Sequence, residues 1–176
     1  MKRLYILAGA NGSGKSTISK VLLPSEGIVY VNPDDIAKEL NPTDPVSARI
    51  EAGRVTLGKI NTLLESGDSF AVESTLSGNA YIKMLEQAKV AGYETIIAYV
   101  FVDSPEVCIA RIAARVKNGG HYVPDEDVRR RYQRSKEYPS LCATGGSLDA
   151  VLQRGNRRYS CGPWEWRNQC GLERTL

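Results

Sequence analysis

Nine consecutive residues near the start of the chain combine glycines, a lysine and hydroxyl groups at a spacing that suits nucleotide phosphates. They fit the pattern G-x-x-x-x-G-K-[ST] without a mismatch: Gly9, Ala10, Asn11, Gly12, Ser13, Gly14, Lys15, Ser16 and Thr17. Glycines permit a tight turn whose N–H groups face an anion, and the N-terminus of a following helix favours the same charge. We expect Lys15 to reach the β- and γ-phosphates of ATP and the Ser16 hydroxyl to bind Mg2+. The alternative is a strand-to-helix turn without a ligand, which the complete match disfavours.

Three carboxylates follow segments that read as strands. Asp34, Glu73 and Asp103 each come after an apolar run, and ligand residues of open α/β sheets lie at the carboxyl ends of strands. A phosphoryl transferase needs one carboxylate to orient or deprotonate the accepting hydroxyl and another to hold Mg2+. Competing interpretations exist: Asp34 and Asp35 could cap a helix, and Asp103 could begin the helix at Pro105. From the residues alone, Asp34 and Asp35 are both candidates for the base.

Arginines are arranged around a Gly-Gly pair at 119–120 in the manner of a lid. Arg111 and Arg115 are four residues apart, so a helix would place both guanidinium groups on one face. A second helix would return Arg131 towards the same place. Arginines over the γ-phosphate stabilise charge in the transition state of phosphoryl transfer. We therefore expect Arg115 and Arg131 to be catalytic, whereas a solvated basic helix is the alternative.

The elements that must position these residues alternate between strands and helices, which predicts a parallel sheet covered by helices on both faces. Each expected strand leads into a helix through a turn that carries polar or charged residues. The fold class is therefore α/β. We predict strands over 3–8, 27–32, 69–73 and 95–102, and helices over 16–23, 33–40, 45–66, 80–91 and 105–116.

Composition fits one domain of moderate charge. The 176 residues are 42% hydrophobic and carry a formal net charge of +3, enough apolar material for a sizeable core. Lys and Arg concentrate between Arg111 and Arg134, and such a local cluster suits a phosphate better than a nucleic acid. Within it we expect Arg129 and Arg130 to lie on the surface and His121 to belong to the lid. Without a signal peptide or an apolar run of membrane length, we expect a cytoplasmic protein with no membrane partner. Its four cysteines are read as free thiols.

The last residues differ from the rest in composition. From Cys142 the chain is rich in Gly, Arg and Trp and shows no clear period of a helix or a strand. We divide the chain into a P-loop kinase domain over 1–140 and an atypical tail over 141–176. Residues 143–154 can be translated back into codons. When some of the permitted codons are read one nucleotide later, they encode a strand-like sequence with Trp, Tyr and Asn. We therefore interpret the tail as the product of a frameshift, which would leave the closing strand missing or replaced and the tail poorly ordered.

Four motifs in this order resemble the zeta-toxin family, in its stand-alone chromosomal branch. They are residues 9–17, 31–37, 71–78, and 119–124 with 131–132, and the resemblance spans 1 to about 138. It implies a P-loop NTPase fold of nucleoside-kinase-like architecture with an arginine-bearing lid. It also implies an ATP- and Mg2+-dependent kinase, since the family's toxins phosphorylate a sugar hydroxyl of UDP-N-acetylglucosamine. An antitoxin protein is the partner that the family suggests.

The resemblance also implies roles for individual residues. Asp34 would be the base, Lys15 and the lid arginines the phosphate clamp, and Glu73 with Thr75 the contacts to the substrate. Two alternatives stay open beside a UDP-N-acetylglucosamine kinase. One is a kinase of another small metabolite, and the other is an inactive nucleotide-binding relic of a toxin that acts through a partner.

Overall fold

The computed structural model describes residues 1–22, 28–76, 80–136, 147–154 and 157–161, and for the last two ranges it describes the backbone only. Six strands form one sheet in the order β2-β3-β1-β4-β5-β6. The first five are parallel, and β6 pairs with β5 in the antiparallel direction. The strands are β1 (Arg3–Ala8), β2 (Val29–Val31), β3 (Phe70–Ser74), β4 (Glu94–Phe101), β5 (Ser147–Arg154) and β6 (Arg157–Cys161).

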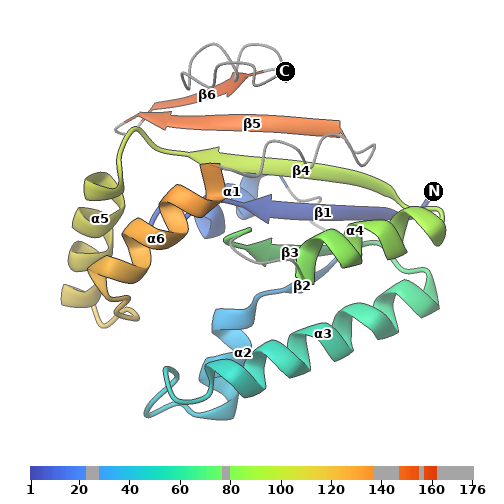
Figure 1. The fold of residues 1–176 in the computed structure, drawn as a ribbon, viewed down its shortest axis with the longest axis horizontal. Coiled ribbons are helices and arrows are strands. Elements are labelled where there is room, and N and C mark those ends of the chain that lie inside the picture. Colours follow the sequence, from blue (N-terminus) through green and yellow to red (C-terminus); the bar gives the residue numbers. More distant parts are fainter. Residues whose placement is uncertain (23–27, 77–79, 137–146, 155–156, 162–176) are drawn as a thin grey trace.

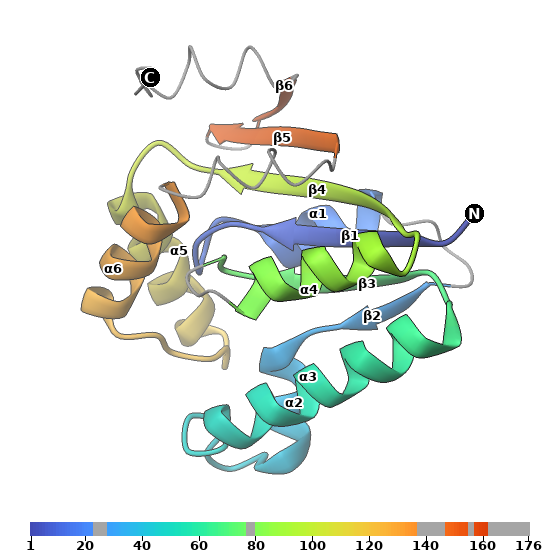
Figure 2. The ribbon, with the colours of Figure 1, turned by 45° about the vertical axis from the view of Figure 1, so that its right-hand side comes forward.

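In the described part of the chain, six helices connect and flank these strands. They are α1 (Lys15–Leu22), α2 (Pro33–Leu40), α3 (Arg49–Ser66), α4 (Ala80–Val90), α5 (Pro105–Lys117) and α6 (Asp125–Lys136). The views in Figures 1 and 2 place α1 and α4 on opposite faces of the sheet. The carboxyl ends of the parallel strands point to one edge, and α2, α5 and α6 gather beyond it (Figure 1). Side chains at strand ends therefore meet residues from these three helices.

The central strands are buried on both faces, as the strands of a parallel sheet with helices on either side must be. Leu4 and Ile6 of β1, Phe70 and Val72 of β3 and Ile97 of β4 have at most 1% of their surface exposed. These strands read as apolar runs in the sequence for the same reason. The α/β architecture with a parallel sheet is the one that the sequence predicts, and none of the described helices has both the length and the apolar character needed to cross a bilayer.

Helix α3 differs from its prediction. It begins at Arg49, four residues after Pro45, and three apolar residues of the predicted range are exposed: Val46, Ile50 and Leu57. The helix packs against α2 and β2 at the edge of the sheet, so that it buries only one narrow stripe, which includes Ala52 and Ile60. Much of its outer face therefore meets solvent.

Two strands lie within the segment that reads as an atypical tail. Residues 147–154 pair in parallel with β4 as β5, and 157–161 return as β6. The sequence shows no clear strand period here, and the structure nevertheless forms two strands over these ranges. Local sequence period is a weak guide here, because the exposed edge of β4 supplies a template for backbone pairing. The rest of the tail lies outside the described residues.

Candidate active site

The phosphate loop connects β1 to the first turn of α1. Gly9 has a φ of +137°, and a Cβ at this position would overlap the carbonyl oxygen of Val100 in β4, so only glycine fits. The amide of Ser13 donates to the carbonyl of Ala10 at 3.1 Å and closes the turn. The loop is thus held against the neighbouring strand, with the start of α1 directed at the space above it.

A cavity of about 340 Å³ opens over this loop. Six of the nine predicted phosphate-binding residues line it, and Gly9, Ala10 and Ser13 lie behind them as support. Backbone N–H groups at the start of α1 and the positive end of its dipole make this cavity suited to phosphates. The lining residues are Asn11, Gly12, Gly14, Lys15, Ser16 and Thr17 from the loop, with Asp34, Glu73, Arg111, Ile112 and Arg115 from other elements.

Lys15 is buried at the centre of the loop. Its ammonium donates to the carbonyl oxygens of Gly9 at 2.9 Å and Ala10 at 3.0 Å, and only 5% of the residue is exposed. Burial lowers the pKa of Lys15, and the negative charges of Glu73 and Asp34 oppose that shift. The Lys15 Nζ lies 3.7 Å from Glu73 Oε1. The ammonium thus lies between the loop carbonyls and the carboxylate at the end of β3.

Glu73 connects three elements at this site. Its Oε2 accepts a hydrogen bond from the Ser16 hydroxyl at 2.9 Å and another from the phenol of Tyr30 in β2. Burial raises the pKa of Tyr30, and its hydrogen bond to Glu73 adds to the rise. The sequence predicts that Glu73 contacts the substrate, and the structure places its carboxylate against Ser16 and Lys15 on the phosphate side. It also lines the neighbouring cavity described below.

These oxygens fit Mg2+. The ion prefers hard oxygen ligands and commonly takes one or two from the protein while substrate phosphates and waters supply the rest. Ser16 Oγ and the Glu73 carboxylate, 9% exposed, form such a pair next to the phosphate cavity. Both residues could hold Mg2+, directly or through water, and the ion would neutralise charge on the phosphates.

Asp34 and Asp35 have different environments, which separates the two candidate bases. Asn32 caps α2, because its Oδ1 accepts from the amide of Asp34 at 3.0 Å, and its Nδ2 donates to Asp35 Oδ2 at 2.9 Å. Asp35 is exposed and also pairs with Lys38 at 3.4 Å. Within the described ranges, no hydrogen bond or ion pair reaches the carboxylate of Asp34. The cap is therefore supplied by Asn32, and the Asp34 carboxylate is left for a ligand.

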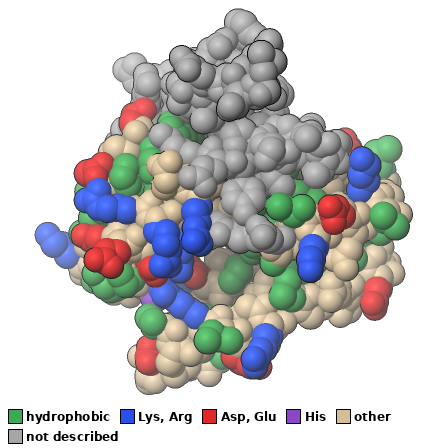
Figure 3. All heavy atoms as spheres, in the orientation of Figure 1, with side chains coloured by type: hydrophobic (Ala, Val, Ile, Leu, Met, Phe, Trp, Pro, Cys, Tyr) green, Lys and Arg blue, Asp and Glu red, His purple; other side chains and the backbone are tan. Residues whose placement is uncertain are grey.

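The lid segment, defined as residues 105–136, brings arginines to both sides of the phosphate loop. Arg111 donates to the carbonyl of Ser13 at 3.1 Å and Arg131 to Asn11 Oδ1 at 2.9 Å. Arg115 lines the phosphate cavity and donates to the carbonyl of His121 at 2.7 Å. Figure 3 shows Lys and Arg side chains gathered where α6 faces α2. The arginines predicted to be catalytic, Arg115 and Arg131, are thus both beside the site.

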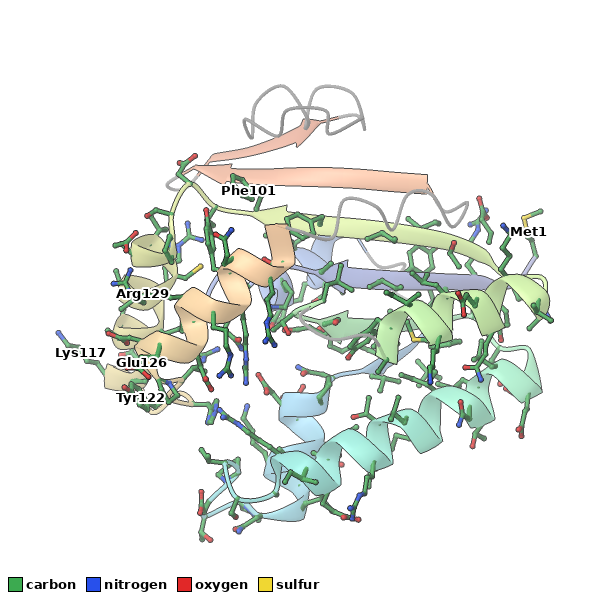
Figure 4. The ribbon with its side chains drawn as sticks, viewed as in Figure 1. Met1, Phe101, Lys117, Tyr122, Glu126 and Arg129 are labelled. Carbon is green, nitrogen blue, oxygen red and sulfur yellow. The ribbon has the colours of Figure 1, made fainter. Side chains whose placement is uncertain are left out.

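Other charged residues of the lid segment point away from the loop. Arg129 pairs with Glu106 of α5, and Arg130 pairs with Asp127 at 2.6 Å, with about half of each arginine side chain exposed. Figure 4 shows Lys117 and Glu126 at the outer end of this layer. The Arg129–Glu106 pair joins α6 to α5 on the solvent side, whereas the Arg130–Asp127 pair lies within α6.

A second cavity, of about 420 Å³, adjoins the phosphate cavity. We call it the acceptor cavity. It shares Asn11, Lys15, Asp34 and Glu73 with the phosphate cavity, and it extends between α2, α3 and the turn after β3. The predicted substrate residues Glu73 and Thr75 both line it. Its other lining residues are Asn32, Pro33, Arg49, Gly53, Ser74, Tyr81 and Arg131.

Asp34 lies where the cavities meet. It lines the phosphate cavity, the acceptor cavity and a third space of about 350 Å³ beside Ser16 and Tyr30. A carboxylate in this position can contact a hydroxyl in one cavity and a phosphate in the next. Asp103, by contrast, is exposed after the end of β4 and lines none of these three spaces.

Two polar residues of the site, Arg49 and Tyr30, were not predicted from the sequence. Arg49 reaches the acceptor cavity because α3 begins beside α2, which depends on tertiary packing that no local pattern reveals. Tyr30 points from β2 to Glu73. The sequence did carry one signal for its role, which is its position near the carboxyl end of an expected strand. Arg111 was recognised as a lid residue, and its contact with the loop carbonyl of Ser13 depends on how α5 packs.

The strand order, the phosphate loop after β1 and the arginine-bearing helices beside it together define a P-loop protein of the kinase-like class. The chain belongs to the zeta toxin family, whose model matches residues 1–156. That match extends past residue 140 and includes β5.

The chain is also similar to a protein of Haemophilus influenzae and to several solved structures. An uncharacterized protein of Haemophilus influenzae strain Rd is 40% identical over 138 residues, which cover 74% of this chain and 98% of the relative. A solved structure from the PezAT chromosomal toxin–antitoxin system of Streptococcus pneumoniae superposes with a TM-score of 0.63 at 19% identity, covering 90% of this chain and 72% of the other. An AvrRxo1-ORF1:ORF2 structure with ATP gives 0.64 at 18% identity, covering 91% and 57%. The two structural likenesses show the fold.

Proposed function

We propose that the protein is an ATP-dependent kinase that transfers the γ-phosphate to a hydroxyl of a small acceptor. The observation that carries this proposal is the position of Asp34, which lies at the junction of a phosphate cavity and a second cavity large enough for a small molecule. A protein that only binds ATP needs the phosphate loop alone. A carboxylate between the two cavities is what phosphoryl transfer requires to orient or deprotonate an accepting hydroxyl.

Each residue of the site has a role in this proposal. Asp34 accepts the proton of the acceptor hydroxyl. At the same time the hydroxyl oxygen forms a bond to the γ-phosphorus, and the bond from that phosphorus to the leaving ADP oxygen breaks. Lys15, Arg115 and Arg131 surround the transferring phosphoryl group with positive charge. Ser16 and Glu73 would hold Mg2+, which would neutralise charge on the phosphates. ATP is supported as donor by the complete phosphate-loop pattern and by the related fold that was solved with ATP.

For the acceptor we propose a sugar nucleotide, with UDP-N-acetylglucosamine as the first compound to test, on the strength of the family membership. A kinase of another small metabolite would use the same carboxylate and the same cations. Because the related PezAT proteins form a toxin–antitoxin system, we also propose an antitoxin as a partner protein. Both the ATP supply and such a partner would place the activity in the cytoplasm.

The experiment is phosphate transfer from γ-labelled ATP with Mg2+, using the full chain, UDP-N-acetylglucosamine and a reaction without acceptor. Label on the sugar nucleotide supports the proposal. Label on another compound of an acceptor panel keeps the kinase and changes its substrate. If ATP binds and no acceptor in the panel is labelled, the kinase proposal fails and the binding relic is favoured.

A further inference from the structure

Arg49 is the first residue of α3, and it reaches the acceptor cavity without a carboxylate partner. Its guanidinium donates to Nε2 of His121 at 2.8 Å. None of the ion pairs between described residues includes Arg49. A guanidinium has five N–H donors, so that one bond to an imidazole leaves most of them for a ligand.

The acceptor cavity carries an excess of positive charge. Three cations line it, Lys15, Arg49 and Arg131, against two carboxylates, Asp34 and Glu73. Burial lowers the pKa of Arg131, the carboxylate of Asp127 at 3.6 Å opposes that shift, and the positive charge of Arg49 adds to it. Arg49 and Arg131 line the same cavity, so an anion beside them would relieve the repulsion between their charges.

The helix also leaves room next to Arg49. Gly53 lies one turn further along α3 and lines the same cavity. No atom lies within 4 Å of the place where its Cβ would be, and its backbone is not in the left-handed region. Glycine is unfavourable within a helix, and here neither packing nor backbone conformation requires it. The space that it leaves lies on the same helix face as Arg49, four residues away.

His121 orients the arginine. Because Nε2 accepts the bond from Arg49, the imidazole is neutral with its proton on Nδ1. The carbonyl of His121 is in turn held by Arg115 at 2.7 Å. The Arg49 side chain is therefore fixed to the lid segment, in a position from which it can contact a ligand in the acceptor cavity.

We propose that Arg49 is a specificity-determining residue, which binds a phosphate or diphosphate group of the acceptor at a distance from the hydroxyl that faces Asp34. Acceptors with such a group are selected over neutral ones. Planar guanidinium groups bind phosphate through paired hydrogen bonds, and the spare donors, the excess positive charge and the open space beside Gly53 all serve that contact. This inference rests on the proposed kinase function, in which the second cavity holds the acceptor.

A binding measurement tests the anion site without any turnover. The full chain is saturated with Mg2+ and a non-hydrolysable ATP analogue, and inorganic pyrophosphate is titrated by calorimetry into the wild type, Arg49→Met, Arg49→Lys and Arg54→Met. Arg54 is the matched control, since it lies on the same helix, is exposed and pairs with Glu51. We expect the wild type and Arg54→Met to bind one pyrophosphate, Arg49→Met to bind it at least tenfold more weakly, and Arg49→Lys to fall between them.

The inference is overturned if the wild type binds no pyrophosphate or if Arg49→Met binds it as tightly as Arg54→Met does. Equal affinity for the ATP analogue in all four proteins shows that the fold is intact. In the transfer assay, Arg49→Met should raise KM for the sugar nucleotide at least tenfold while kcat and the KM for ATP change little. If no acceptor is phosphorylated but pyrophosphate binding still depends on Arg49, the kinase proposal fails and the anion site stands.

Discussion

The Ser16 hydroxyl donates a 2.9 Å hydrogen bond to the Glu73 carboxylate, which joins the first turn of α1 to the end of β3 across 57 residues of sequence. Ser16 follows the loop lysine, and Glu73 is the penultimate residue of β3, the strand next to β1, so the sheet order itself brings them together. The bond pre-positions two oxygen ligands beside the phosphate cavity. This relationship leads to the first prediction.

Glu73→Gln should weaken the binding of Mg2+ at the active site by about tenfold, because a neutral amide is a poorer ligand for a hard cation. The amide keeps nearly the same shape and can still accept from Ser16. The measurement is the Mg2+ dependence of phosphate transfer at saturating ATP. An unchanged Mg2+ dependence would remove Glu73 from the metal site.

Tyr30→Phe removes the hydrogen bond from the Tyr30 phenol to the Glu73 carboxylate. We expect the free energy of unfolding to fall by about 1–2 kcal/mol, since the bond goes to a charged and largely buried group. Urea denaturation measures the change. Tyr122→Phe is a matched control because Tyr122 is 55% exposed, and equal stability of the two variants would show that the Tyr30 contact contributes nothing.

Gly9→Ala should destabilise the fold by about 3 kcal/mol or more. The φ of +137° disfavours any side chain, and the new Cβ would overlap the carbonyl of Val100. Gly58→Ala in α3 provides the opposite case: no atom lies within 4 Å of the Cβ position, so we expect stability to rise by about 0.5–1 kcal/mol. Thermal unfolding of both proteins tests the pair, and a stable Gly9→Ala protein would contradict the loop geometry.

The environment of His121 leads us to expect that the stability of the fold depends on pH. Burial lowers the pKa of His121 below the ordinary value of 6.5, Asp34 opposes that shift, and Arg49, Arg115 and Lys38 lower the pKa further. The unfolded chain therefore binds this proton more readily than the folded protein, so that stability falls as the pH drops below about 6.5. His121→Gln should flatten the profile between pH 6.5 and the lowered pKa, as measured by urea denaturation at several pH values. The same slope in both proteins would show that His121 does not titrate in this way.

Much of the site could be predicted because it lies where local patterns end. The complete phosphate-loop pattern located Lys15 and Ser16, and the strand ends located Asp34 and Glu73, since parallel strands present their carboxyl ends at one edge. The same rule failed for Asp103, which follows β4 and yet faces solvent. The rule gives the edge of the sheet at which a residue lies, but it does not say which residues at that edge line the cavities.

The remaining features depend on contacts between distant segments. Arg49 reaches the acceptor cavity through the packing of α3 on α2, and Tyr30 reaches Glu73 across β2 and β3. The pairing of 147–154 with β4 is equally non-local and was not visible in a sequence without a strand period. The frameshift interpretation of the tail stays a prediction, and sequencing the gene in both frames tests it.

The central claim is that Asp34 is the base of a phosphoryl transfer, and its most direct test compares Asp34→Asn with Asp35→Asn. The two residues are neighbours, but Asp34 lines both cavities while Asp35 pairs with Asn32 and Lys38. We predict that Asp34→Asn lowers the rate of transfer from labelled ATP by about 10²–10⁴-fold, with ATP affinity within a few fold of the wild type, and that Asp35→Asn stays close to the wild type. Equal turnover by the two variants would contradict the account.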